Sequence, residues 1–224
     1  QIQADSIAAV EAAQRMSSDT ASVAQVAAAP VSIYKDSLLE AAHSAEAQIV
    51  TLANDKFEVA FTTKGAQPYS VKINEYSSYG GGELFIFKPE MSRYDIQVYA
   101  GETINTADFN FVVAEKTDTS LAMRLPFAGG GYIEQRYSIA EGSYSVKNYL
   151  SFVGMENVIP KNVFSFDVDY FVTMPRMEKG YKSEVQYSKL DYYCAGEKKP
   201  EAIAKGRGAQ KRVDAKVSWF AFQQ

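Results

Sequence analysis

One histidine and one cysteine are the side chains of this 224-residue chain best suited to nucleophilic or acid–base chemistry, and they stand far apart. His43 lies in an alanine-rich N-terminal stretch, whereas Cys194 follows two tyrosines near the other end. Residues 49–224 therefore contain no histidine for a catalytic triad or a His-based acid–base pair. We interpret Cys194 as an inert, buried thiol, because a free cysteine with no activating neighbour behaves as a small hydrophobic residue. One Cys and one His also exclude a Cys/His zinc site and a disulfide framework.

Other patterns that suggest chemistry have simpler structural explanations. Asp167 and Asp169 share one face of a predicted strand, but a calcium site needs about six or more oxygen ligands, so we expect a solvated strand face. The triplets Gly80–Gly82 and Gly129–Gly131 are not followed by Lys-Ser or Lys-Thr, so we expect hairpin turns rather than phosphate loops. Pairs of carboxylates can hydrolyse glycosides, but we interpret the acidic residues as surface groups. The sequence thus predicts no catalytic residue, no metal and no cofactor, and we expect a protein that is not an enzyme.

The charge of the chain is concentrated at its N-terminal end. The 23 Lys and Arg and 27 Asp and Glu residues give a net charge of −4, which argues against nucleic-acid binding. Residues 1–48 carry six acidic and two basic residues, and Tyr34 is their only aromatic side chain. A segment so poor in large apolar residues cannot fold alone, so we expect residues 1–48 to be a partly helical tether in front of one domain, residues 49–224. Ser37 and Glu40 predict a capping box that starts one of its helices.

From about residue 50 onward the dominant hydrophobic period is two, which is typical of half-buried strands. In Phe164–Thr173 the even positions are all apolar, whereas only Phe171 is apolar among the odd ones. Strands are predicted at 57–63, 70–76, 84–88, 94–100, 104–114, 120–127, 131–139, 146–152, 164–173, 181–193 and 213–220. With no long helical period between them and no fixed repeat, they predict an all-β fold, a large antiparallel β-sandwich.

Two stretches rise above this background as candidate contact surfaces. The segment 197–212 has a net charge of +4, because two acidic residues, Glu197 and Glu201, stand against six cations. The cations are Lys198, Lys199, Lys205, Arg207, Lys211 and Arg212. Such a loop is able to meet anionic lipid or an acidic partner, although a solvated hairpin loop is the more common explanation of a charge run. The second stretch is the aromatic C-terminal end with Trp219, Phe220 and Phe222, at a place where chains usually fray.

Both ends of the sequence suggest a longer parent protein. The chain begins at Gln1 without a Met or a signal peptide, and no apolar run approaches the ~20 residues that cross a bilayer. We expect a fragment whose targeting or anchoring segment lies outside it. We expect the aromatic end either to complete the core or to lead into a further part of the parent.

Four segments, taken in order, resemble the large periplasmic domain of the YidC family of membrane protein insertases. They are Leu52–Ala66 with its turn Thr63-Lys64-Gly65-Ala66, Gly131–Ile139, Met177–Tyr187, and Trp219–Gln224. Glycine is common in the family where this chain has Ala66, and a small residue there preserves the turn. The resemblance implies a β-supersandwich like that of the galactose mutarotases, with a short C-terminal helix and a tether that follows a first transmembrane helix. Mutarotase chemistry does not come with it, because those enzymes use a histidine that this sandwich lacks.

The resemblance also implies a place and a role. The parent would be a multi-pass protein of the Gram-negative inner membrane with this domain on the periplasmic face, and it would insert and fold membrane proteins alone or with the Sec translocon. The partners implied are Sec translocon subunits, nascent membrane proteins and the parent's own transmembrane domain, to which Trp219, Phe220 and Phe222 would couple the sandwich. The fragment itself would be a binding and positioning module without the insertase groove.

Two other functions remain open from the residues. A periplasmic or secreted carbohydrate-binding sandwich would use cleft aromatics, and the chain has 15 tyrosines, although tyrosine is also enriched in ordinary sheets. A sugar-dependent rise in melting temperature would distinguish this alternative from a partner-binding domain. A mutarotase-like enzyme would need a carboxylate pair to transfer protons without a histidine, which is the weaker alternative.

Overall fold

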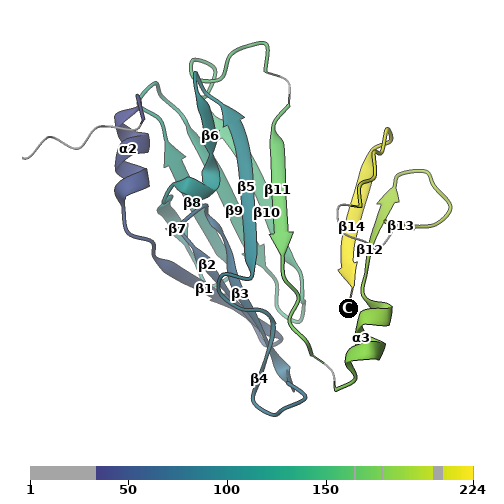
Figure 1. Ribbon diagram of the computed structural model, residues 1–224. Coiled ribbons are helices and arrows are strands. Elements are labelled where there is room, and N and C mark those ends of the chain that lie inside the picture. The colour runs from purple at the N-terminus through teal and green to yellow at the C-terminus, as the bar shows by residue number, and fades with distance from the viewer. Residues whose placement is uncertain (1–33, 164, 178, 204–208, 224) are drawn as a thin grey trace, which may run out of the picture. The chain divides into compact units, whose positions relative to one another are not determined.

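The computed structural model describes residues 34–163, 165–177, 179–203 and 209–223, and these lie in one compact unit (Figure 1). Four antiparallel sheets make up most of it. The first has the order β1-β2-β3-β4, and the second the order β10-β9-β8-β7. Two three-stranded sheets have the orders β11-β5-β6 and β13-β12-β14. This arrangement confirms the predicted all-β, antiparallel fold and fits a sandwich.

The strands and helices have the following bounds. The first two sheets consist of β1 Ile49–Ala53, β2 Phe57–Thr62, β3 Gln67–Ser77, β4 Glu83–Phe87, β7 Val112–Lys116, β8 Ser120–Pro126, β9 Tyr132–Ile139 and β10 Val146–Val153. The smaller sheets consist of β5 Ser92–Tyr99, β6 Thr103–Asn105, β11 Asp167–Val172, β12 Lys189–Cys194, β13 Glu201–Ile203 and β14 Val217–Gln223. The helices are α2 Ser37–Ser44, the 3-10 turn η1 Thr106–Asp108, and α3 Tyr181–Tyr187.

The period of two sets which strand faces form the core. On β9, Ile133, Gln135 and Tyr137 are buried, and they pair with Leu125, Met123 and Leu121 of β8. The intervening residues of β9 carry the polar and charged groups, since successive side chains of a strand point to opposite faces. The glycine triplets join β3 to β4 and β8 to β9, which confirms that they are hairpin turns.

Helix α2 moves the start of the domain earlier than the sequence predicted. Leu39 and Ala42 belong to the same hydrophobic core as the strands, so residues 34–48 are part of the compact unit rather than of a tether. The rest of the predicted tether, residues 1–33, lies outside the described residues. Asp36, rather than Ser37, is the N-cap, because its carboxylate accepts from the N–H groups of Leu38 and Leu39 at 2.9 and 3.3 Å.

Two predicted strands are broken in the structure. The stretch 104–114 is divided into β6, η1 and β7, and 181–193 begins with helix α3 before β12. The helix is favoured by Glu184, whose buried carboxylate accepts from the N–H of Met177 at 2.7 Å and so ties the helix to the chain before it. The short helix expected at the C-terminal end therefore precedes β12, and the last described residues form β14.

Candidate functional site

An apolar cavity of about 680 Å³ opens among strands from all four sheets. Its lining residues are Pro68, Tyr94, Tyr137, Val146, Asn148, Val168, Tyr170 and Phe220. A volume in the range of about 300–1,000 Å³ with mostly apolar walls is typical of ligand sites. No Asp, Glu, Lys, Arg or His is among the described residues that line it.

Aromatic rings build the walls of this cavity. Tyr94 of β5 and Tyr170 of β11 occupy paired positions, with ring centroids 6.1 Å apart in an edge-to-face arrangement. Phe220 and Phe222 of β14 approach Tyr170 from the other side, at 6.4 and 5.9 Å. The rings of Tyr170, Phe220 and Phe222 are 37–56% exposed, so they offer apolar surface to a ligand as well as to one another.

The polar groups at the cavity are neutral. Asn148 donates from Nδ2 to Oε1 of Gln135 at 2.8 Å, and Nε2 of Gln135 is buried with no hydrogen-bond partner among the described residues. Burial raises the pKa of Tyr94, an effect that the nearby Gln135 amide partly offsets, and burial also raises the pKa of Tyr137 and Tyr170. All three hydroxyls are therefore protonated near neutral pH. The cavity is suited to binding an apolar group.

The strands beside the cavity have unpaired edges. Among the described strands, β11 pairs only with β5, and β14 pairs only with β12. Edge strands present rows of free backbone N–H and C=O groups, which an extended peptide is able to pair with. The site therefore combines aromatic walls with backbone hydrogen-bonding capacity.

The turn Thr63–Ala66, which is part of the family resemblance, contacts a residue of the cavity wall. Tyr137 donates its hydroxyl proton to the carbonyl of Ala66 at 2.8 Å, and Nζ of Lys64 donates to the carbonyl of Asp108 at 2.6 Å. The hydroxyl of Thr63 accepts from the N–H of Gln48 at 2.9 Å. These bonds hold the turn against the core, which indicates a structural role for it.

Both the backbone conformation and the close approach of Ala107 favour glycine at position 65. Its φ is +72°, and a Cβ there would lie 3.1 Å from the Cα of Ala107. Ala66 also has a positive φ, of 48°, in the left-handed region that disfavours residues with a side chain. The backbone thus explains why glycine is favoured at both positions.

The three C-terminal aromatic residues divide between two faces of β14. Phe220 and Phe222 face the cavity side, whereas the ring of Trp219 stacks on Tyr193 of β12 at 5.8 Å. The three are 42%, 56% and 37% exposed in chain order. Their predicted coupling to a membrane part stays a prediction.

Two of the six cations of the predicted basic loop form exposed ion pairs in the structure. Lys211 pairs with Glu201 at 3.6 Å, and Arg212 pairs with Asp214 at 3.2 Å. Lys198 and Lys199 are exposed. Lys205 and Arg207 lie outside the described residues. Lipid or partner contact by this loop stays a prediction.

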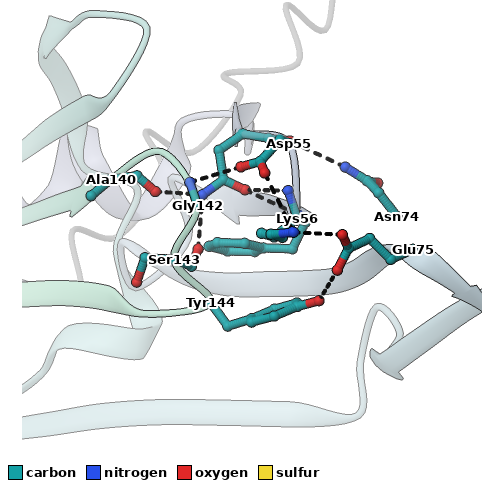
Figure 2. Close-up of polar contacts among 10 residues, drawn as sticks. Asp55, Lys56, Asn74, Glu75, Ala140, Gly142, Ser143 and Tyr144 are labelled. Atoms are coloured by element: carbon teal, nitrogen blue, oxygen red, sulfur yellow. Dashed lines mark hydrogen bonds and ion pairs between the residues drawn. The ribbon is translucent and has the colours of Figure 1, made fainter.

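A polar cluster, which we call the turn clamp, joins the first and second sheets at their ends (Figure 2). It consists of Asn54, Asp55, Lys56, Glu75 and Tyr144. In the turn between β1 and β2, Nδ2 of Asn54 donates to the carbonyls of Ala140 and Ser143 at 2.6 and 2.8 Å. The carboxylate of Asp55 accepts from the N–H of Gly142 at 2.8 Å. The Asn-Asp turn was visible in the sequence, but nothing in the sequence indicated its partners 85 or more residues away.

Charge reinforces the turn clamp. Nζ of Lys56 donates to one carboxylate oxygen of Glu75 at 2.5 Å, and the hydroxyl of Tyr144 donates to the other (Figure 2). The bond from Lys56, helped by that from Tyr144, lowers the pKa of Glu75. The N–H of Gly142 lowers the pKa of Asp55. Every charged member is satisfied within the clamp, so it acts as a fastener between sheets.

The hairpin Gly131–Ile139, a second segment of the resemblance, has a charged outer face. Burial raises the pKa of Glu134, but bonds from Arg124 and Arg136 at 2.7 and 3.1 Å outweigh it and lower the pKa overall. Arg124 also lies 4.4 Å from the ring centroid of Tyr132. This network spans β8 and β9 and leaves Gln135 and Tyr137 for the interior.

The remaining residues considered for chemistry have structural surroundings. Cys194 is buried and free, as predicted. His43 lies on α2 with its ring 5.3 Å from Tyr34, inside the compact unit rather than in a tether. Asp167 and Asp169 are exposed on β11, which confirms the predicted solvated face. Among the described residues, no group of three or more His, Cys, Asp or Glu side chains is placed to hold a metal ion.

Comparison with known proteins identifies relatives over the whole length of the chain. It is 25% identical over 236 residues to the membrane protein insertase YidC of Porphyromonas gingivalis, covering 100% of this chain and 38% of that protein. It is 26% identical over 220 residues to YidC of Phocaeicola vulgatus, covering 98% and 35%. YidC of Bacteroides fragilis is 23% identical over 188 residues, covering 84% and 30%. No family model and no solved structure matches the chain.

The chain thus spans about a third of the length of the curated relatives it matches. These similarities confirm the resemblance to the YidC insertases and do not favour the carbohydrate-binding alternative. No described helix is long and apolar enough to cross a membrane.

Proposed function

We propose that this chain is the periplasmic accessory domain of a YidC-type inner-membrane insertase and acts there by binding and positioning, not by catalysis. The observation that carries the proposal is the similarity of the whole chain to about a third of each of several insertases. The all-β fold and the four ordered sequence segments support it. The transmembrane parts of such a parent would perform insertion itself.

The apolar cavity is the proposed binding site of this domain. Nascent membrane proteins are rich in apolar segments, and the rings of Tyr94, Tyr170 and Phe220 match such segments in chemistry. An extended segment would also pair with the free edge of β11 or β14. Sec translocon subunits and the parent's own membrane domain are the further proposed partners.

The end of the chain would couple the cavity to the membrane domain. Phe220 lines the cavity, and Trp219, the preceding residue, lies on the opposite face of β14 against Tyr193. An occupant in contact with Phe220 would therefore bind the strand that carries Trp219. Sec dependence and coupling are separate parts of the proposal and need separate measurements.

The test is an insertion assay with the full-length parent. A parent without residues 34–223 is compared with the intact protein for several membrane-protein substrates, with and without the Sec translocon. We expect a reduced yield for at least one substrate that carries a periplasmic loop. Unchanged yields for every substrate would overturn the accessory role.

A matched pair of variants tests the cavity within that assay. Tyr170→Ala combined with Phe220→Ala removes two walls of the cavity, whereas Tyr149→Ala removes an exposed ring of β10 that does not line it. We expect the double variant to reproduce the loss seen on deletion and Tyr149→Ala to behave as the intact parent. Equal effects of both variants would exclude the cavity as the binding site.

A further inference from the structure

A second surface, outside the cavity, brings basic side chains onto aromatic rings. We call it the hairpin surface, and it consists of Tyr79, Phe85 and Lys88 from the β3–β4 region together with Arg176, Lys179 and Tyr181 from the start of α3 and the chain before it. Lys88 lies 5.6 Å from the ring centroid of Phe85, and Lys179 lies 5.7 Å from that of Tyr79. Arg176 lies 5.3 Å from that of Tyr181. The contact between Lys179 and Tyr79 joins segments about 100 residues apart in sequence into one surface.

Both tyrosine rings of the hairpin surface are open to solvent, whereas Phe85 is half-buried. Tyr79 is 60% exposed and Tyr181 is 59% exposed, and the neighbouring Tyr76 of β3 is 63% exposed. A hollow of about 430 Å³ lies between the hairpin and residues 175–177. Exposed aromatic side chains gathered in this way are typical of interaction surfaces.

The hairpin tip is closed by hydrogen bonds and has open space around its glycines. The hydroxyl of Ser78 donates to the carbonyl of Gly81 at 2.6 Å, and the N–H of Ser78 donates to the carbonyl of Gly82 at 3.1 Å. No atom lies within 4 Å of where a Cβ would stand on Gly80, Gly81 or Gly82. A tip without side chains lets a flat surface approach the rings beside it.

Two lysines of the hairpin surface carry positive charge outside its ion pairs, against one exposed carboxylate nearby, Glu90. Arg176 pairs with Glu184 at 3.5 Å, and Glu83 pairs with Lys72 at 3.4 Å. Lys88 and Lys179 form no ion pair with a described acidic residue. In the segment 197–212, Lys211 and Arg212 are paired, whereas Lys198 and Lys199 are exposed and form no ion pair with a described acidic residue.

We propose that the hairpin surface contacts an anionic phospholipid bilayer. Tyrosine rings prefer the boundary between headgroups and acyl chains, and lysines are attracted to anionic headgroups. No side chain of Gly80, Gly81 or Gly82 stands between the neighbouring rings and a planar lipid surface. The proposal goes beyond the proposed function and rests on it only for placing the chain beside a membrane.

Vesicle flotation with the 224-residue chain tests the contact without the rest of the parent. We expect binding to vesicles of phosphatidylcholine with phosphatidylglycerol, weaker binding to phosphatidylcholine alone, and weaker binding at high salt, since salt screens surface charge. Lys88→Gln and Lys179→Gln should each lower the partition coefficient about fivefold, since one lysine near an anionic surface contributes about 1 kcal/mol. Circular dichroism confirms that each variant is folded.

The matched control removes charge from the loop that the sequence had indicated. Lys198→Gln combined with Lys199→Gln changes the total charge as much as the two hairpin substitutions together. We expect this control to keep most of the vesicle binding. Absence of vesicle binding by the unaltered chain, or a loss confined to the loop variant, would overturn the proposal.

Fluorescence locates the surface independently of charge. With Trp219→Phe removing the only tryptophan, Tyr79→Trp places a reporter on the hairpin surface and Tyr149→Trp places one on β10. Brominated lipids should quench the first reporter and not the second. A hairpin surface that instead bound polyglutamate or single-stranded DNA and left the reporter unquenched on vesicles would identify a macromolecular partner and refute the bilayer contact.

The vesicle assay and the insertion assay test the two proposals independently. Loss of insertion on deleting the domain, with no vesicle binding, would support the proposed function and overturn the bilayer contact. Vesicle binding with unchanged insertion would support the contact and overturn the accessory role.

Discussion

Gly65 is a residue whose replacement the structure constrains both by backbone conformation and by space. The positive φ there costs an alanine about 1–2 kcal/mol, and the backbone of Ala107 leaves its Cβ too little room. The same turn receives the hydroxyl of Tyr137 on the carbonyl of Ala66, so a shift of the turn would reach the cavity wall. A single residue thus connects backbone conformation to the candidate site.

We predict that Gly65→Ala destabilises the protein more than Gly81→Ala does. Gly81 has a similar φ, +82°, but no atom within 4 Å of the Cβ position, so its replacement carries only the conformational cost. The difference should be at least about 1 kcal/mol, the lower end of the cost of overpacking. Urea unfolding of the two variants measures it. Equal losses would mean that the turn relaxes away from Ala107 without cost.

At the scale of elements, helix α2 shows that position on a helix decides the energetic role of a residue. Leu39 is 1% exposed and lies in the common core, whereas Leu38, the adjacent residue, is 40% exposed. The sequence suggested a weak helix here but assigned it to a tether, because the segment around it is alanine-rich and acidic. Composition reports the average of a segment, and two buried residues are enough to dock a helix.

We predict that Leu39→Ala lowers the free energy of unfolding by about 2–5 kcal/mol, the usual cost of emptying a buried leucine site. Leu38→Ala removes the same atoms from an exposed position and should change stability by about 0.5 kcal/mol or less. Thermal unfolding of both variants makes the comparison. Similar small effects for both would show that α2 does not belong to the folded domain.

At the scale of the whole molecule, the turn clamp joins two sheets whose contacting residues lie more than 80 positions apart in the sequence. Asn54 and Asp55 bind the β9–β10 turn, and Lys56 binds Glu75 on β3. Glu75 and Asp55 both have pKa values below the usual carboxylate range. A carboxylate whose pKa is lower in the folded state stabilises that state above its unfolded pKa, and the contribution is lost as the pH falls through the folded pKa.

We therefore predict that Glu75→Gln destabilises the protein at pH 7 and that the difference from the unaltered protein shrinks below about pH 4, where the unfolded carboxyl begins to bind protons. Glu141→Gln changes an exposed carboxylate in the neighbouring turn and serves as the control. Urea unfolding across this pH range gives both differences. A Glu75→Gln effect that is constant with pH would show that the clamp does not depend on ionised Glu75.

The local sequence pattern alone was sufficient to predict much of the secondary structure of this protein. The alternation of apolar residues predicted most strands and the buried faces of β2, β8 and β9, but it was wrong for the predicted strand 164–173, where Phe166, Val168 and Tyr170 are exposed. The glycine triplets predicted two hairpins, and the scarcity of His and Cys excluded several chemistries. The order of four short segments was enough to identify the family resemblance. Each of these properties depends on side chains within a few residues of one another, which is why a single sequence reveals them.

Tertiary structure decided what those strands build together. The cavity takes its walls from six strands, β3, β5, β9, β10, β11 and β14, the turn clamp joins Asn54 to the turn at residues 140–144, and the hairpin surface joins Tyr79 to Lys179. It also paired Lys211 and Arg212 with acids and folded 181–187 into a helix. Hydrophobic period reports which face of a strand is buried but not which distant strand covers it. Contacts of that kind depend on the register and packing of the whole chain.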